Sequence, residues 1–102
     1  MPREIFLTFG SKTNNMIIVV NHQINNPKDF WEAAQKSLSE LPATGVTRVL
    51  QVMPNNDNTA ATCVWEADSK EALDAYLRSK VGDWSNETYQ EVNTAGAMGL
   101  AL

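Results

Sequence analysis

His22 is the residue best suited to acid–base chemistry. It is the single histidine of the 102-residue chain, and an imidazole with an unperturbed pKa near ~6.5 exchanges protons readily around neutral pH. His22 closely follows the apolar run Met16–Val20, and Glu66 holds the corresponding place after a later run, Thr59–Trp65. Because a carboxylate beside an imidazole orients the ring and raises its basicity, we predict His22 and Glu66 as a catalytic acid/base pair. The alternative interpretation is that both residues end their strands in solvent and pair across the sheet edge.

Aromatic side chains form the second group with chemical potential, since Trp and Tyr combine a flat apolar body with one polar atom. Trp31 is expected on the first helix, Tyr76 on the second, and Trp84 in the segment that follows. Together with His22 they are predicted to line a substrate pocket for a small aromatic ligand. The other interpretation of the same residues is ordinary packing in the core and at a dimer interface.

Cofactor and metal chemistry find no support in the sequence. The one cysteine, Cys63, lies in the apolar run Ala60–Trp65, which is typical of a small buried thiol. One histidine and one buried cysteine are too few ligands for a metal site. The five glycines form neither a GxGxxG nor a GxxxxGK phosphate loop. We therefore expect no cofactor and no metal.

The elements that must position these side chains are indicated by β-branched runs and helix-capping residues. Asn26 and Pro27 are typical of a helix start, and Asp68 with Glu71 three residues later forms an acidic variant of the capping box. Gly82 is the expected helix stop. The sequence predicts strands at 16–20, 46–53, 59–65 and 87–92, and helices at 27–41 and 69–80. This order predicts a ferredoxin-like βαββαβ fold of the α+β class, with a four-stranded antiparallel sheet and two helices on one face.

The predicted topology has consequences for the site and for assembly. Right-handed crossovers are expected to bring the first and third strands together at the centre, running parallel, so that His22 and Glu66 meet at one edge. Both helices cover one face of the sheet. The strands at 16–20 and 46–53 are apolar on both faces, and an open apolar face of several hundred Å² is too large to leave in water. A second copy of the sheet is the simplest cover, so a homodimer through the sheet face is predicted.

In this organisation the chain resembles the dimeric α+β barrel superfamily. The resemblance covers about residues 16–100 and is carried by segments 16–22, 30–34, 64–69 and 71–77. It implies two sheets packed face to face as a barrel, with a pocket between sheet and helices. Members of the superfamily include cofactor-free antibiotic-biosynthesis monooxygenases, haem-degrading enzymes and muconolactone isomerases. The chain is most similar to the small members without known activity.

Two departures from the superfamily pattern matter. Haem-degrading relatives carry a haem-ligating histidine on the second helix, and residues 71–80 contain none, so haem is not expected. Residues 1–15 are predicted to be an N-terminal extension of a domain that spans 16–102. Either Met16 is the natural start, or Ile5–Phe9 is an extra strand that extends the sheet or meets the partner subunit.

Composition excludes several classes of function. A length of 102 residues fits one domain, and eight basic against twelve acidic residues give a net charge of -4, without the basic stripe that nucleic-acid binding needs. No apolar run approaches the ~20 residues needed to cross a bilayer, and no secretory signal is present, so a cytoplasmic protein is expected. Two functions remain: a cofactor-independent monooxygenase or isomerase acting on a small aromatic or polyketide-like compound, or a non-catalytic dimeric module that binds a small ligand or a protein.

Overall fold

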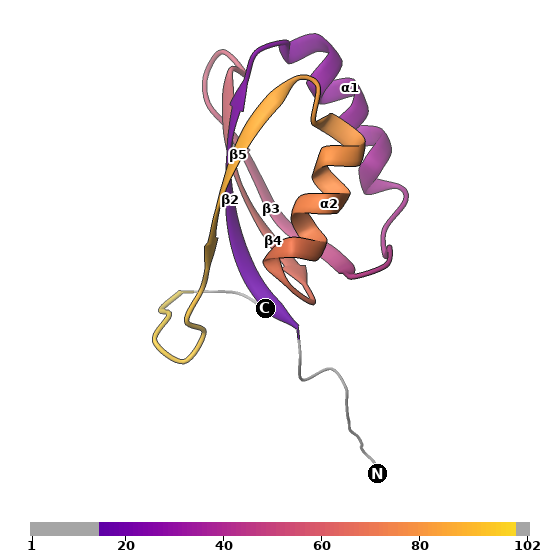
Figure 1. Ribbon diagram of the computed structural model, residues 1–102. Coiled ribbons are helices and arrows are strands. Elements are labelled where there is room, and N and C mark those ends of the chain that lie inside the picture. The colour runs from indigo at the N-terminus through magenta and orange to yellow at the C-terminus, as the bar shows by residue number, and fades with distance from the viewer. Residues whose placement is uncertain (1–14, 100–102) are drawn as a thin grey trace.

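The fold is that of a ferredoxin-like α+β protein, as predicted (Figure 1). The computed structural model describes residues 15–99, so the strand predicted at 5–9 lies outside the described residues. The elements follow in the order β2 (Met16–Ile24), α1 (Pro27–Leu38), β3 (Val46–Pro54), β4 (Ala60–Ala67), α2 (Lys70–Val81) and β5 (Ser85–Glu91).

Helix α1 begins where the capping residues predict. The Asn26 side chain accepts a hydrogen bond from the Asp29 N–H at 3.2 Å, and Pro27 occupies the first turn. The helix ends at Leu38, three residues before the predicted end. The N–H groups of Ser39 and Glu40 bond to carbonyls three residues back, which tightens the last turn before the chain leaves the helix.

The N-cap of α2 corrects the sequence prediction. Ser69, not Asp68, caps the helix, because its hydroxyl oxygen accepts a hydrogen bond from the Ala72 N–H at 3.0 Å. The N–H of the preceding residue, Asp68, donates to the Gly45 carbonyl at 2.9 Å. Both residue types cap helices well, and Ser69 is the one that has the extended N-cap backbone and the capping hydrogen bond.

The sheet has the strand order β3-β4-β2-β5, and all neighbouring strands are antiparallel. The predicted parallel pairing of β2 with β4 is therefore wrong. The crossover through α1 makes β2 and β3 parallel, and the tight connection from β3 to β4 then reverses β4. His22 lies opposite Ala61, whereas Glu66 lies opposite Ile17. At about 3.3 Å per residue, His22 and Glu66 are roughly 17 Å apart along the strands.

The two helices pack against one face of the sheet (Figure 1), and the hydrophobic core lies between the helices and the sheet. The core is formed mainly by Ile18, Val20, Phe30, Trp65, Leu73 and Leu77. Val46 and Val49 both pack on this side, although strict alternation assigned them to opposite faces. The register shifts between Val46 and Arg48 and between Val49 and Gln51, which breaks the alternation of β3.

The face without helices is mixed in character. Ile17 and Val64 are buried apolar residues on it, while Asn21 is exposed and accepts a hydrogen bond from the Thr62 hydroxyl at 2.8 Å. The apolar character expected of the open face from residues 16–20 and 46–53 thus holds in part, since Met53 of β3 is also apolar on this face and is 46% exposed.

Candidate functional site

A cavity of about 210 Å³ lies between the helices and the helix-covered face of the sheet. Its walls are mostly apolar, with contributions from both helices and from β2, β3 and β4; they include Phe30, Trp31, Ala34, Leu38, Val52, Cys63, Trp65, Leu77 and Val81. Leu38 and Val52 are each 38% exposed, which puts the mouth of the cavity between the end of α1 and β3. The polar side chains on the wall are His22, Gln35 and Ser37.

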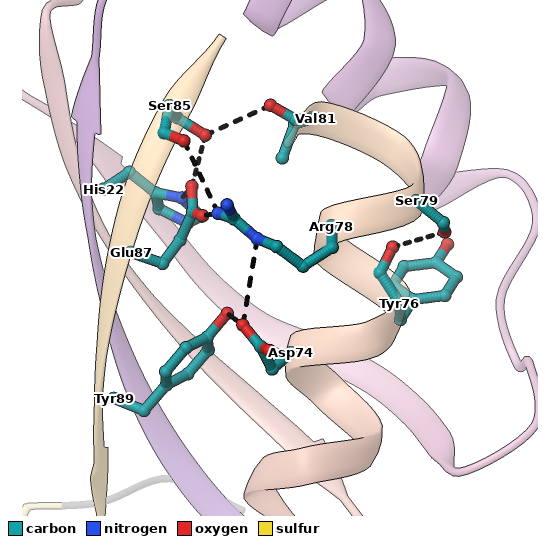
Figure 2. Close-up of polar contacts among 9 residues, drawn as sticks. All are labelled: His22, Asp74, Tyr76, Arg78, Ser79, Val81, Ser85, Glu87 and Tyr89. Carbon is teal, nitrogen blue, oxygen red and sulfur yellow. Dashed lines mark hydrogen bonds and ion pairs between the residues drawn. The ribbon is translucent and has the colours of Figure 1, made fainter. Parts of the chain in front are cut away.

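The ring of His22 forms a hydrogen bond with the carboxylate of Glu87. The two residues are direct cross-strand partners on β2 and β5, and the Nδ1 of His22 lies 2.9 Å from Oε2 of Glu87 (Figure 2). Their side chains are 3% and 0% exposed. An ionised carboxylate only accepts hydrogen bonds, so Nδ1 carries the ring proton and Nε2 keeps a free lone pair. Because Nδ1 is engaged on the β5 side and His22 lines the cavity, we infer that Nε2 faces the cavity.

Glu87 is itself fixed by Arg78 and Ser85 (Figure 2). The Arg78 guanidinium reaches from the last turn of α2 and contacts Oε1 of Glu87 through Nη2. The Ser85 hydroxyl donates to Oε2. Arg78 also lies 3.8 Å from Asp74, which accepts a hydrogen bond from the Tyr89 hydroxyl at 2.7 Å. The buried carboxylate of Glu87 is therefore both neutralised and oriented.

The electrostatics of this cluster keep His22 uncharged. Burial, and to a lesser degree the positive charge of Arg78, lower the pKa of His22 to about 4. The negative charge of Glu87 is balanced by Arg78, so the hydrogen bond orients the ring without holding a second proton on it. Near pH 7 the site presents a neutral imidazole whose Nε2 is an acceptor or a base.

The predicted pocket residues divide into two groups. His22 and Trp31 line the cavity, and the Trp31 indole N–H donates to the Asn58 carbonyl at 3.1 Å. Tyr76 and Trp84 pack against the core outside the cavity lining. The Tyr76 hydroxyl donates to the Ser37 carbonyl at 2.7 Å.

Glu66 belongs to another part of the molecule, and the predicted His22–Glu66 pair is wrong. Glu66 lies at the far end of β4, where it accepts hydrogen bonds from Arg48 at 2.7 Å and from the Asn15 side chain at 2.8 Å. The hydrogen bond from Arg48 is the main reason why the pKa of Glu66 lies below its usual value. Glu87 takes the place that the sequence assigned to Glu66.

Sequence reasoning missed three residues that shape the site. Glu87 and Arg78 were not singled out, although Ser85, Glu87 and Tyr89 share one face of β5 by simple alternation. Pairing that face against His22 would have found the carboxylate. Trp65 was placed only at the end of an apolar run; its ring lines the cavity, and its buried Nε1 has no acceptor among residues 15–99.

Other chemistry finds no site in the described part of the chain. Residues 15–99 contain no group of three His, Cys, Asp or Glu side chains that could hold a metal ion. Burial raises the pKa of Cys63 to about 11, so its thiol stays protonated and unreactive. No helix within the same range is long and apolar enough to span a membrane.

Comparison with known proteins establishes the fold. Neither a protein-family model nor a curated protein matches the sequence. Among solved structures, the fold matches one described as "Putative antibiotic biosynthesis monooxygenase from Nitrosomonas europaea", with a TM-score of 0.52 and 16% sequence identity over 78% of this chain and 86% of that chain. This likeness confirms the ferredoxin-like α+β fold. The activity in that description belongs to the Nitrosomonas protein.

Proposed function

We propose that the protein binds a small planar compound in the 210 Å³ cavity and that His22 acts on it as a general base. The observation that carries this proposal is the neutral His22 ring on the cavity wall, with Nδ1 fixed by Glu87 and Nε2 free. A positioned base of this kind contributes about 10²–10⁴-fold to a proton transfer. The reaction needs no bound cofactor.

The size and character of the cavity limit the substrate. An apolar cavity of about 150 Å³ accommodates benzene, so a volume of 210 Å³ suits one six-membered ring with small substituents. A fused polyketide-like ring system would extend through the mouth past Leu38 and Val52.

Proton removal at such a substrate leads to two reactions. In an isomerase, the proton returns to a different atom of the delocalised anion. In a monooxygenase, the carbanion forms a C–O bond with dioxygen, the co-substrate, and the resulting peroxide takes up a proton. Its O–O bond then breaks as the same carbon loses its second hydrogen, which leaves a carbonyl group and water. The fold shared with the Nitrosomonas europaea protein supports the second reaction by analogy only.

We also propose that a second copy of the chain covers the sheet face without helices. Ile17 and Val64 of this face are already buried within one chain, so the contact would rest on its more exposed apolar side chains, such as Met53, which is 46% exposed. The expected solution mass is about twice 11.3 kDa, which light scattering measures directly; a monomer would contradict the proposal. A cytoplasmic location is proposed as well, consistent with the free buried thiol of Cys63.

The general-base role is tested with a single-ring 1,3-dicarbonyl compound, 2-acetylcyclohexanone, whose keto and enol forms differ in ultraviolet absorbance. The protein is expected to accelerate their interconversion. His22→Gln should lose about a hundredfold of that acceleration. The matched control is Glu66→Gln, which changes a carboxylate far from the cavity and should leave the rate within twofold. Equal rates for the His22 variant and the unmodified protein would refute the role.

Binding without turnover is the second candidate function, and the low pKa of His22 favours it. A base with a pKa of about 4 removes only acidic protons, but its lone pair still accepts a hydrogen bond. In that case a ligand raises the melting temperature, and no product forms.

A further inference from the structure

Apart from the weak S–H donor of Cys63, the buried polar groups of the cavity wall offer a ligand hydrogen-bond acceptors rather than donors. Nε2 of His22 carries a lone pair, because the ring proton is committed to Glu87. The hydroxyl of the buried Ser37 donates to the Ala34 carbonyl at 2.7 Å, so its oxygen also faces a ligand only as an acceptor. Trp65 presents ring carbons to the cavity, since its Nε1 is fully buried. Gln35 can donate, but it is exposed.

The same wall does not suit a negative charge. Among residues 15–99, neither lysine nor arginine lines the cavity, and the guanidinium of Arg78 is engaged with Glu87 and Asp74. A carboxylate in this apolar space would lose its hydration and gain no positive partner, which is unfavourable.

We propose that the cavity selects neutral single-ring compounds that donate a hydrogen bond, phenols in particular, and that Glu87 sets this preference by dictating which nitrogen of His22 is protonated. The inference rests on the proposed function in so far as the cavity is the ligand site. It goes further, because it states the hydrogen-bonding polarity and the charge of the ligand and assigns their origin to Glu87, a positioning residue behind His22.

The cluster around Glu87 makes the preference reversible by one substitution. In Glu87→Gln, Arg78 still needs an acceptor at the position of Oε1, so the amide oxygen turns toward Arg78. The amide NH₂ then occupies the position of Oε2, which lies 2.9 Å from Nδ1 of His22. Because the amide donates there, Nδ1 must accept, and the ring proton moves to Nε2. The cavity then offers a donor where it offered an acceptor.

The experiment compares binding of three probes to the unmodified protein: phenol, benzonitrile and benzoate. Phenol donates a hydrogen bond, benzonitrile only accepts one, and benzoate carries a charge. Trp31 and Trp65 line the cavity, so their fluorescence reports occupancy, and calorimetry provides an independent measurement. We expect phenol to bind about tenfold more tightly than benzonitrile and benzoate to bind more weakly than both. Equal affinities for phenol and benzonitrile, or tighter binding of benzoate, would overturn the proposal.

The variant Glu87→Gln tests the origin of the preference. Its ratio of phenol to benzonitrile affinity is expected to fall at least tenfold, to parity or below. Glu91→Gln is the matched control, because it makes the same chemical change at an exposed position of the same strand and should preserve the ratio. An unchanged ratio in folded Glu87→Gln, judged by circular dichroism, contradicts the assigned role of Glu87. If this variant does not fold, the unmodified protein with its three probes still decides the ligand preference.

Failure of this inference can be told apart from failure of the proposed function. The probes measure binding, whereas the keto–enol assay measures turnover that depends on His22. If the protein prefers phenol but shows no turnover, the proposed ligand class is supported and the general-base role of His22 is refuted. Turnover that depends on His22 without any donor preference removes the ligand class alone.

Discussion

Lowering the pH should destabilise the protein through His22 alone before most carboxylates titrate. In the unfolded chain the imidazole has its ordinary pKa of 6.5, whereas burial and Arg78 lower the pKa in the folded protein to about 4. Between these two pKa values, His22 is protonated in the unfolded state and neutral in the folded state. The contribution of His22 to the free energy of unfolding is therefore fully present above pH 6.5 and is lost progressively as the pH falls to 4.

The magnitude follows from the difference between the two pKa values. At about 1.4 kcal/mol for each pKa unit, the lowering of the His22 pKa from 6.5 to about 4 corresponds to roughly 3 kcal/mol. That is a large fraction of the ~5–15 kcal/mol that usually stabilises a domain. Through the middle of this range, the free energy of unfolding should fall by about 1.4 kcal/mol per pH unit.

Urea denaturation at several pH values between 7.5 and 4.5, followed by tryptophan fluorescence, measures this slope. The control is His22→Gln, which has no titrating group at position 22 and should show a much flatter dependence over the same range. Carboxylates with lowered pKa values, Glu66 among them, contribute equally to both proteins and cancel in the difference.

Nuclear magnetic resonance supplies the decisive check, because His22 is the only histidine and its ring signals are unambiguous. The ring should stay neutral down to about pH 5. A ring that titrates near pH 6.5 in the folded protein, or equal slopes for the two proteins, would show that burial and Arg78 do not keep the imidazole uncharged.

Four further substitutions test other parts of the structure. Arg78→Met should raise the pKa of His22 and destabilise the protein by about 2 kcal/mol. This is less than the ~3–5 kcal/mol of a fully buried pair, because the Arg78 side chain is 42% exposed. Ring titration and urea denaturation measure the two effects, and an unchanged His22 pKa would contradict the ion pairing. Ser69→Ala should cost about 1 kcal/mol of unfolding free energy and Asp68→Ala much less, whereas the opposite order would restore Asp68 as the cap. Gly45→Ala should cost more than ~1 kcal/mol, because Gly45 has φ +78° and an added Cβ would lie 2.7 Å from the Ala72 Cβ; a melting temperature equal to that of the unmodified protein would refute this.

The order of elements could be predicted from the sequence because it depends on local signals. Asn26 and Pro27 start α1 through contacts within a few residues, and the apolar run from Met16 predicts a strand whatever its neighbours are. The ends of elements depended on more distant contacts. Ser69 rather than Asp68 caps α2, and the N–H of Asp68 bonds to Gly45, a residue that lies far away in the chain.

The candidate site also combines a feature that the local sequence indicates with features that depend on distant contacts. His22 could be found by its type alone, but its partner depends on strand direction and register. One error of direction placed Glu66 beside His22, whereas the antiparallel sheet brings in Glu87 from the last strand. Arg78 could not be foreseen, because its contact with Glu87 requires α2 to cross β5 at one particular height.

The low pKa of His22 also restricts the chemistry that the site can perform. Proton transfer to a base with a pKa of about 4 costs about 1.4 kcal/mol for each pKa unit by which the substrate is the weaker acid. A substrate ten units less acidic would need about 14 kcal/mol for this step, close to the whole barrier of about 16 kcal/mol that allows ~10 turnovers per second. Simple ketones are therefore poor substrates. A phenol, at a pKa near ~10 like that of tyrosine, needs about 8 kcal/mol and stays within reach. If His22 is a catalyst, its substrate is an acidic phenol or 1,3-dicarbonyl compound, the same kind of hydrogen-bond donor that the cavity wall favours.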